Sequence, residues 1–319
     1  MARPTTAIAS QRQAMIPDSP IASLIQHDGP GVLAVIVGVE GPSYRPVGAM
    51  MAVFPNGDRS GTLSSGCIEA DIALHAARCL EEGTPMQIRY GRGSVYRDIS
   101  LPCGGGLDIL LLPNPDRAIL SKLSAAQAAR HVASLRIDPK TGGLSLCEDG
   151  PTGWDEHGFR LQFCPELRFL IFGKGPESNS FASLVHVSGF PALLLSPDTE
   201  TLAHGAQADC ATRHLVQAVF PGDLAVDPWT AIVLFFHDHE WEPPILTAAL
   251  SSPAFYIGAQ GSQRARDARN LMLQAEGATP AELTRLRGPI GLVPSARDAR
   301  TLAVSVLAEV LAVAMAEGL

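Results

Sequence analysis

The chain has 319 residues, enough for about two domains. Apolar residues make up 46% of it and charged residues 18%, a composition that excludes a disordered chain. The formal net charge of −8 argues against nucleic acid as a partner, because phosphates attract a basic surface. The longest apolar stretch, residues 302–316, contains Glu309 and is shorter than a bilayer span requires. We therefore expect a soluble, cytoplasmic protein that binds neither nucleic acid nor a membrane.

Residues 1–20 show no periodicity and are expected to form a loose arm, and residues 21–115 have the pattern of an α+β domain. A Pro-Asn-Gly-Asp turn between two apolar runs is typical of a hairpin. A helix is predicted at residues 68–80, where apolar side chains recur with helical spacing up to Gly83. The expected strands lie at residues 32–40, 49–54, 60–63, 86–90 and 107–112.

Residues 116–165 begin with a helical stretch and continue as glycine-rich strands, which we interpret as a bridge between domains. From residue 166 onward, continuous apolar runs alternate with helical segments, as in parallel strands that are covered on both faces. These strands are expected at residues 169–172, 191–195, 231–236 and 254–257. The predicted fold is α/β: an N-terminal α+β domain followed by a Rossmann-like, doubly wound parallel-sheet domain at residues 166–319.

A cysteine stands where a predicted strand meets a predicted helix, in the segment Ser64-Ser65-Gly66-Cys67-Ile68-Glu69. The helix dipole lowers the pKa of a cysteine at this position and favours its thiolate. Glu69 opposes thiolate formation but stabilises the first turn of the helix. The pattern is equally consistent with Cys67 as a small buried side chain and Glu69 as a capping charge.

A second cysteine opens the segment Cys103-Gly104-Gly105-Gly106. Consecutive glycines allow backbone N–H groups to approach an anionic ligand closely, and a thiol beside them suits a soft metal or a sulfur-containing ligand. The alternative is a flexible loop after a strand. The sequence does not place Cys67 and Cys103 together, and the nearby basic run Arg89, Arg92 and Arg97 is typical of an exposed face.

Two segments of the second domain follow predicted strands. Gly173-Lys174-Gly175 stands where a dinucleotide-binding fingerprint belongs, but Ser178 replaces its third glycine, so the fingerprint is weak. His237-Asp238-His239 follows the strand at residues 231–236, at the edge where open parallel sheets bind ligands. These side chains could face a ligand, hold a metal or form a solvated corner.

Together these segments resemble the xanthine dehydrogenase accessory protein family (XdhC/CoxI). The resemblance implies a chaperone that binds molybdenum cofactor (molybdopterin) and shields it while a terminal oxo ligand is exchanged for sulfur. Such a protein delivers the cofactor to a xanthine dehydrogenase-type apoenzyme, with a cysteine desulfurase-type sulfur donor, and we expect a homodimer. The matching pieces lie in consistent order at residues 41–49, 61–69, 103–106, 237–240, 256–258, 288–292 and 303–309.

On this resemblance, Cys67 and Cys103 are expected to contact the metal, and Arg45 to bind the cofactor's phosphate in a bidentate manner. The chain is then a non-enzymatic chaperone, and the alternative is an NAD(P)-dependent oxidoreductase that uses the Rossmann-like domain. No catalytic residue is assigned, and the sequence does not choose among client molybdoenzymes. The expected cofactor-binding residues are Arg45, Cys67, Glu69, Cys103, Gly104, Gly105, Gly106, Gly173, Gly175, His237, Asp238 and His239.

Overall fold

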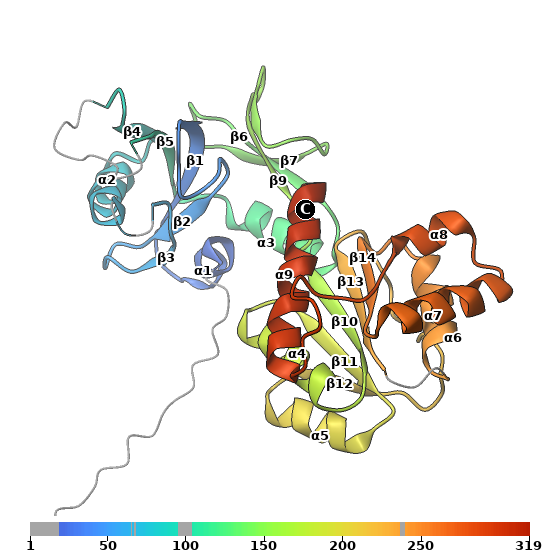
Figure 1. The fold of residues 1–319 in the computed structure, drawn as a ribbon. Helices are drawn as coiled ribbons and strands as arrows, with labels where there is room; N and C mark the ends of the chain where they lie inside the picture. Colours follow the sequence, from blue (N-terminus) through green and yellow to red (C-terminus); the bar gives the residue numbers. More distant parts are fainter. Residues whose placement is uncertain (1–18, 65, 67, 95–103, 237–239) are drawn as a thin grey trace, which may run out of the picture. The chain divides into compact units, whose positions relative to one another are not determined.

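A computed structural model describes residues 19–64, 66, 68–94, 104–236 and 240–319 (Figure 1). The chain divides into two compact units, residues 1–165 and residues 166–319.

The first unit is built on a five-stranded antiparallel sheet with the strand order β3-β2-β1-β5-β4. Side chains of the central strand β1 alternate between the two faces, because successive residues of a strand point in opposite directions. Val32, Ala34 and Ile36 pack toward the helix α2 (Glu69–Glu82), which covers one face. The strands are β1 (Val32–Glu40), β2 (Met50–Val53), β3 (Arg59–Gly61), β4 (Met86–Gly91) and β5 (Gly106–Pro113).

The opposite face of this sheet is covered by two helices and a second antiparallel sheet of four strands, with the order β7-β6-β9-β8. Leu33, Val35 and Val37 of β1 share one core with Leu135, Phe159 and Leu161 of the second sheet. Residues 116–165, interpreted from the sequence as a bridge, thus form a layer of the first unit. The elements are α1 (Pro20–Gln26), α3 (Arg117–Ala128), β6 (Ala133–Ile137), β7 (Leu144–Cys147), β8 (Gly153–Asp155) and β9 (Gly158–Phe163).

The second unit contains a six-stranded parallel sheet with the order β12-β11-β10-β13-β14-β15. This order reverses direction between β10 and β13, as in a doubly wound Rossmann-type sheet, so the predicted fold class is confirmed. The strands are β10 (Arg168–Gly173), β11 (Ala192–Ser196), β12 (Ala211–His214), β13 (Thr230–Phe235), β14 (Tyr256–Ala259) and β15 (Leu286–Arg287).

Helices cover both faces of the parallel sheet. Phe181 of α4 and Val306 of α9 pack on one face, whereas Leu246 of α6 and Leu273 of α7 pack on the other. The helices are α4 (Pro176–Val187), α5 (Thr199–Gln207), α6 (Glu242–Leu250), α7 (Gln263–Ala275), α8 (Pro280–Arg285) and α9 (Ala299–Glu317). By length and composition alone α9 could cross a membrane, but its buried side chains Leu302, Val306 and Val310 pack into the core beside the sheet, which explains its apolar composition.

Candidate functional site

The loop between β3 and α2 is organised by the carboxylate of Glu69, the first residue of the helix. Its Oε1 accepts hydrogen bonds from the Thr62 hydroxyl at 2.6 Å and from the backbone amides of Leu63 and Ser64 at 3.1 and 2.8 Å. Its Oε2 accepts from the Ser64 hydroxyl at 2.7 Å and from the amides of Gly66 and Ile68. The side chain therefore satisfies backbone donors of the loop that precedes the helix and fixes that loop.

The hydrogen bonds around the Glu69 carboxylate determine its pKa. Burial by itself raises the pKa of the carboxyl group, but hydrogen bonds from Thr62 and Ser64 to the charged form lower the pKa to about 2. Glu69 is only 7% exposed, so it remains a buried, internally bonded carboxylate. Cofactor binding by Glu69 stays a prediction. In the structure its carboxylate bonds to the loop and shapes it. Cys67, in the same loop, lies outside the described residues.

The glycines that follow Cys103 lie against other backbone segments. A Cβ atom on Gly105 would stand 2.1 Å from the Pro42 carbonyl oxygen, and one on Gly106 would stand 3.0 Å from that of Arg92. Gly104 is exposed and has a positive φ of +71°, and no atom of the described residues lies within 4 Å of its Cβ position. Close approach of the protein's own backbone thus accounts for Gly105 and Gly106, but not for Gly104. Cys103 lies outside the described residues.

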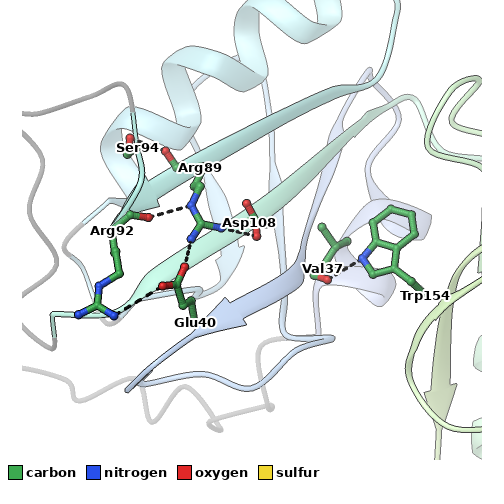
Figure 2. Close-up of polar contacts among 7 residues, drawn as sticks. All are labelled: Val37, Glu40, Arg89, Arg92, Ser94, Asp108 and Trp154. Atoms are coloured by element: carbon green, nitrogen blue, oxygen red, sulfur yellow. Dashed lines mark hydrogen bonds and ion pairs between the residues drawn. The ribbon is translucent and has the colours of Figure 1, made fainter.

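An arginine-centred cluster joins the same segments at the end of the first sheet (Figure 2). The Arg89 guanidinium donates to Asp108 at 2.7 Å, to the Arg92 carbonyl at 2.8 Å, and to Glu40. Hydrogen bonding to Asp108 raises the pKa of Arg89. Arg92 lies 3.6 Å from Glu40, and its amide donates to the Gly105 carbonyl at 3.1 Å. The basic run expected to be an exposed face is, at Arg89, half-buried and paired with two carboxylates.

A hydrogen bond between α2 and β4 brings the surroundings of the two cysteine motifs together. The hydroxyl of Tyr90, a fully buried residue, donates to Asp71 at 2.5 Å. Asp71 lies in the first turn of α2, four positions after Cys67, and Tyr90 directly precedes Gly91, which pairs in register with Gly106. Residues close to each motif in sequence thus meet at one end of the sheet.

Arg45, the predicted phosphate partner, lies beside the loop between β3 and α2. It lines a pocket of about 590 Å³ together with Thr62, the residue that opens the Glu69 loop. The guanidinium is exposed, and among the described residues no carboxylate lies within ion-pair distance of it, in contrast to Arg89. The other lining residues are Pro46, Ala49, Met50 and Gly61.

The buried thiols of Cys79 and Cys210 offer little reactivity. Burial, with the charge of Glu82, raises the pKa of Cys79 to about 11, and burial also raises the pKa of Cys210. Within the described ranges, no group of three or more His, Cys, Asp or Glu side chains could hold a metal ion. Cys67 and Cys103, the predicted metal-contacting thiols, lie outside the residues searched, and their role stays a prediction.

In the second unit, the loop after β10 is satisfied internally. The amide of Gly175 donates to the Thr201 hydroxyl at 2.8 Å, and Thr201 in turn bonds to Asp198. Ser178, fully buried, donates to the Gly175 carbonyl at 3.0 Å, and a Cβ on Gly173 would stand 2.8 Å from Phe235. The Gly175 amide, which would bind a phosphate of a dinucleotide, is therefore already bonded within the protein, and Phe235 fills the space beside Gly173. His237, Asp238 and His239 lie outside the described residues.

Several residues of this region have no signal in the sequence. The partners of Arg89, Tyr90 and Asp71 come from other strands or from a helix, so their pairing depends on strand register. Only the basic run around Arg89 pointed to the cluster, and its spacing gave no indication of the carboxylates opposite.

Two family descriptions match the chain. The XdhC and CoxI family matches residues 24–91, and the XdhC Rossmann domain matches residues 169–310. The first range includes Arg45 and the Glu69 loop, and the second includes most of the parallel sheet.

Two relatives are similar along most of their length. The chain is 36% identical over 289 residues to a protein of Escherichia coli (strain K12) named molybdenum cofactor insertion chaperone PaoD, covering 88% of this chain and 83% of that protein. It is 26% identical to a probable xanthine dehydrogenase subunit of Bacillus subtilis (strain 168), covering 91% and 94%. A crystal structure described as a xanthine dehydrogenase from Bacillus halodurans has the same fold, with a TM-score of 0.76, 24% identity, and coverage of 95% and 96%.

Proposed function

The chain belongs to the XdhC and CoxI family, and we propose that it is an accessory protein that binds molybdenum cofactor and delivers it to a xanthine dehydrogenase-type apoenzyme. The name of the Escherichia coli relative supports the cofactor class, and that of the Bacillus subtilis relative supports the partner class. In this proposal the protein would hold and shield the cofactor during its sulfuration, for which a cysteine desulfurase-type partner would supply the sulfur. The protein acts in the cytoplasm as a homodimer.

The observation that carries the proposal is the hydrogen bond between Asp71 and Tyr90. It ties the helix that follows Cys67 to the strand whose last residue, Gly91, pairs with Gly106. Two cysteine motifs 36 positions apart in the sequence are thereby flanked by residues that lie together. Two thiolates that share a site suit a soft metal or its sulfur ligands, and in this proposal Cys67 and Cys103 are those thiolates.

The residues beside the motifs fit an anionic cargo. Arg45 offers an exposed guanidinium in a pocket next to Thr62, and a guanidinium binds phosphate with two parallel hydrogen bonds. Among the described residues nothing lies within 4 Å of the Cβ position of Gly104, and in this proposal the ligand lies against the backbone there. In this arrangement Glu69 holds the Cys67 loop in place, and Cys67 and Cys103 contact the metal or its sulfur ligands.

The proposal is tested by copurification. The protein is expressed in a molybdenum-replete host that makes the cofactor, and bound pterin is measured by fluorescence after oxidation. We expect about one pterin per wild-type chain and several-fold less in Cys67→Ala and Cys103→Ala. Cys164→Ala, an exposed cysteine in a strand connection, is the matched control and should retain the wild-type amount.

Two results would contradict parts of the proposal. A wild-type protein that carries no pterin would refute cofactor binding. Undiminished pterin in both Cys67→Ala and Cys103→Ala would refute the role of the thiolates and leave cofactor binding to other groups.

A further inference from the structure

Trp154 combines a buried polar end with an exposed aromatic surface. Its Nε1–H donates to the Val37 carbonyl at 2.9 Å, yet the residue is 50% exposed (Figure 2). The register of β1 on β5 shifts between Ile36 and Gly38, so Val37 is the bulge residue that has no partner in the ladder. The indole N–H is the only polar group of a tryptophan side chain. What Trp154 presents to its surroundings is therefore purely aromatic.

Two sets of contacts fix the indole, those of its own ring and those of the residue that follows it. Its ring meets the Phe159 ring edge-on, with centroids 5.2 Å apart and an interplanar angle of 63°. The next residue, Asp155, accepts hydrogen bonds from Arg136 at 2.8 Å and from Arg160 at 2.7 Å. An exposed aromatic side chain that is immobilised before binding loses little conformational entropy when a ligand stacks on it.

Trp154 also lies next to the candidate site. Val37 precedes Gly38, which pairs with Asp108, the carboxylate that Arg89 holds. On the other side, a Cβ atom on Gly48 would stand 3.2 Å from the Thr152 side chain, so the loop that carries Arg45 packs beside the start of β8. Figure 2 shows the indole beside β1 at Val37, with the Arg89 cluster at the end of the same strand.

We propose that the exposed face of Trp154 stacks on the planar ring of the pterin carried by the cofactor. This inference rests on the proposed function and adds a binding residue to it. A pterin ring has a flat π-surface and an edge with both N–H donors and a carbonyl acceptor. Trp154 supplies the stacking surface.

The first experiment observes Trp154 without changing it. The chain has three tryptophans, so the double variant Trp229→Phe/Trp241→Phe leaves Trp154 as the sole tryptophan. This variant is titrated with molybdenum cofactor released from a purified molybdoenzyme, while tryptophan emission and its quenching by acrylamide are recorded. We expect the emission to fall and acrylamide access to decrease, both saturating near one cofactor per chain. Unchanged acrylamide access at saturation would overturn the inference.

The second experiment compares two substitutions that both remove the hydrogen bond to Val37. Trp154→Phe keeps an aromatic face, whereas Trp154→Leu keeps only apolar bulk. We expect cofactor affinity to stay within about threefold of wild type for Phe and to fall about tenfold for Leu, the order of loss seen when a stacking side chain is removed. Leu146→Ala is the matched control, because Leu146 is 42% exposed on the opposite edge strand of the same sheet.

The outcomes separate this inference from the proposed function. Equal affinities of the Phe and Leu variants and wild type, with the wild type loaded, would overturn stacking while cofactor binding stands. Full cofactor loading of Trp154→Leu with reduced delivery to the apoenzyme would assign the side chain to protein docking, which also overturns the inference. Failure of the wild type to carry pterin would refute the proposed function, and the stacking inference would fall with it.

Discussion

Arg89 and Asp108 face each other as direct partners on β4 and β5, and the guanidinium Nη1 donates to the carboxylate Oδ2 at 2.7 Å. A side chain on Gly38 of β1 would intrude on this pair, because its Cβ would stand 2.7 Å from the same oxygen. Arg89 also donates to the Arg92 carbonyl, so the pair is joined to the residues that follow β4. One guanidinium thus connects the ends of β1, β4 and β5.

Arg89→Ala is expected to reduce cofactor loading several-fold while lowering the free energy of unfolding by only about 1 kcal/mol. Ion pairs of partly exposed side chains contribute little to stability, and we infer that Arg89, through Arg92 and Gly105, positions residues that bind the cofactor. Pterin content and urea unfolding measure the two effects. Arg213→Ala, which breaks a comparable pair with Asp223 in the second unit, should leave loading unchanged. Wild-type loading of Arg89→Ala would contradict the positioning role.

Gly105→Ala is expected to lower the free energy of unfolding by about 3 kcal/mol, at the upper end for overpacking, because the new Cβ meets the backbone oxygen of Pro42. Gly104→Ala should cost only about 1 kcal/mol, since its Cβ would meet none of the described residues and the positive φ is the unfavourable factor. Chemical unfolding of the two variants gives the comparison. Equal losses of stability in the two variants would show that the contact with the Pro42 oxygen adds nothing to the cost at Gly105.

Glu69 makes the stability of the first unit depend on pH in a defined direction. Its pKa of about 2 in the folded protein lies below the ordinary value of 4.5, so its stabilisation is present above pH 4.5 and is lost as the pH falls toward 2. The difference corresponds to about 3 kcal/mol. Glu69→Gln should therefore be less stable than wild type at pH 7, and the gap should narrow between pH 4.5 and 2.5 in urea unfolding. A gap that is independent of pH would refute the low pKa.

The second unit is expected to bind NAD(H) and NADP(H) weakly or not at all at millimolar concentration. The Gly175 amide, which would meet a phosphate, already donates to Thr201, and Asp198 bonds to the same threonine. Isothermal titration calorimetry measures this directly, with a known NAD-binding dehydrogenase as the positive control. A micromolar dissociation constant would restore the oxidoreductase alternative.

Local sequence predicted four strands of the parallel sheet, β10, β11, β13 and β14, and helical segments between them, because apolar runs and helical periodicity depend on neighbouring residues. The short strands β12 and β15 were not predicted. Local sequence also identified Arg45 and the two cysteine motifs by their residue types. The second antiparallel sheet, at residues 133–163, was interpreted only as a bridge, since its short glycine-rich strands are defined by their partners.

Only the tertiary structure decided which residues surround the motifs. Asp71 meets Tyr90, and Trp154 meets Val37 across 117 positions, because strand register and a bulge place them opposite one another. Pairings of this kind are set by the packing of whole layers, whose information is spread over the core rather than held in any short segment. Side-chain identity can therefore name a candidate thiol or guanidinium, and the folded sheet alone supplies its neighbours.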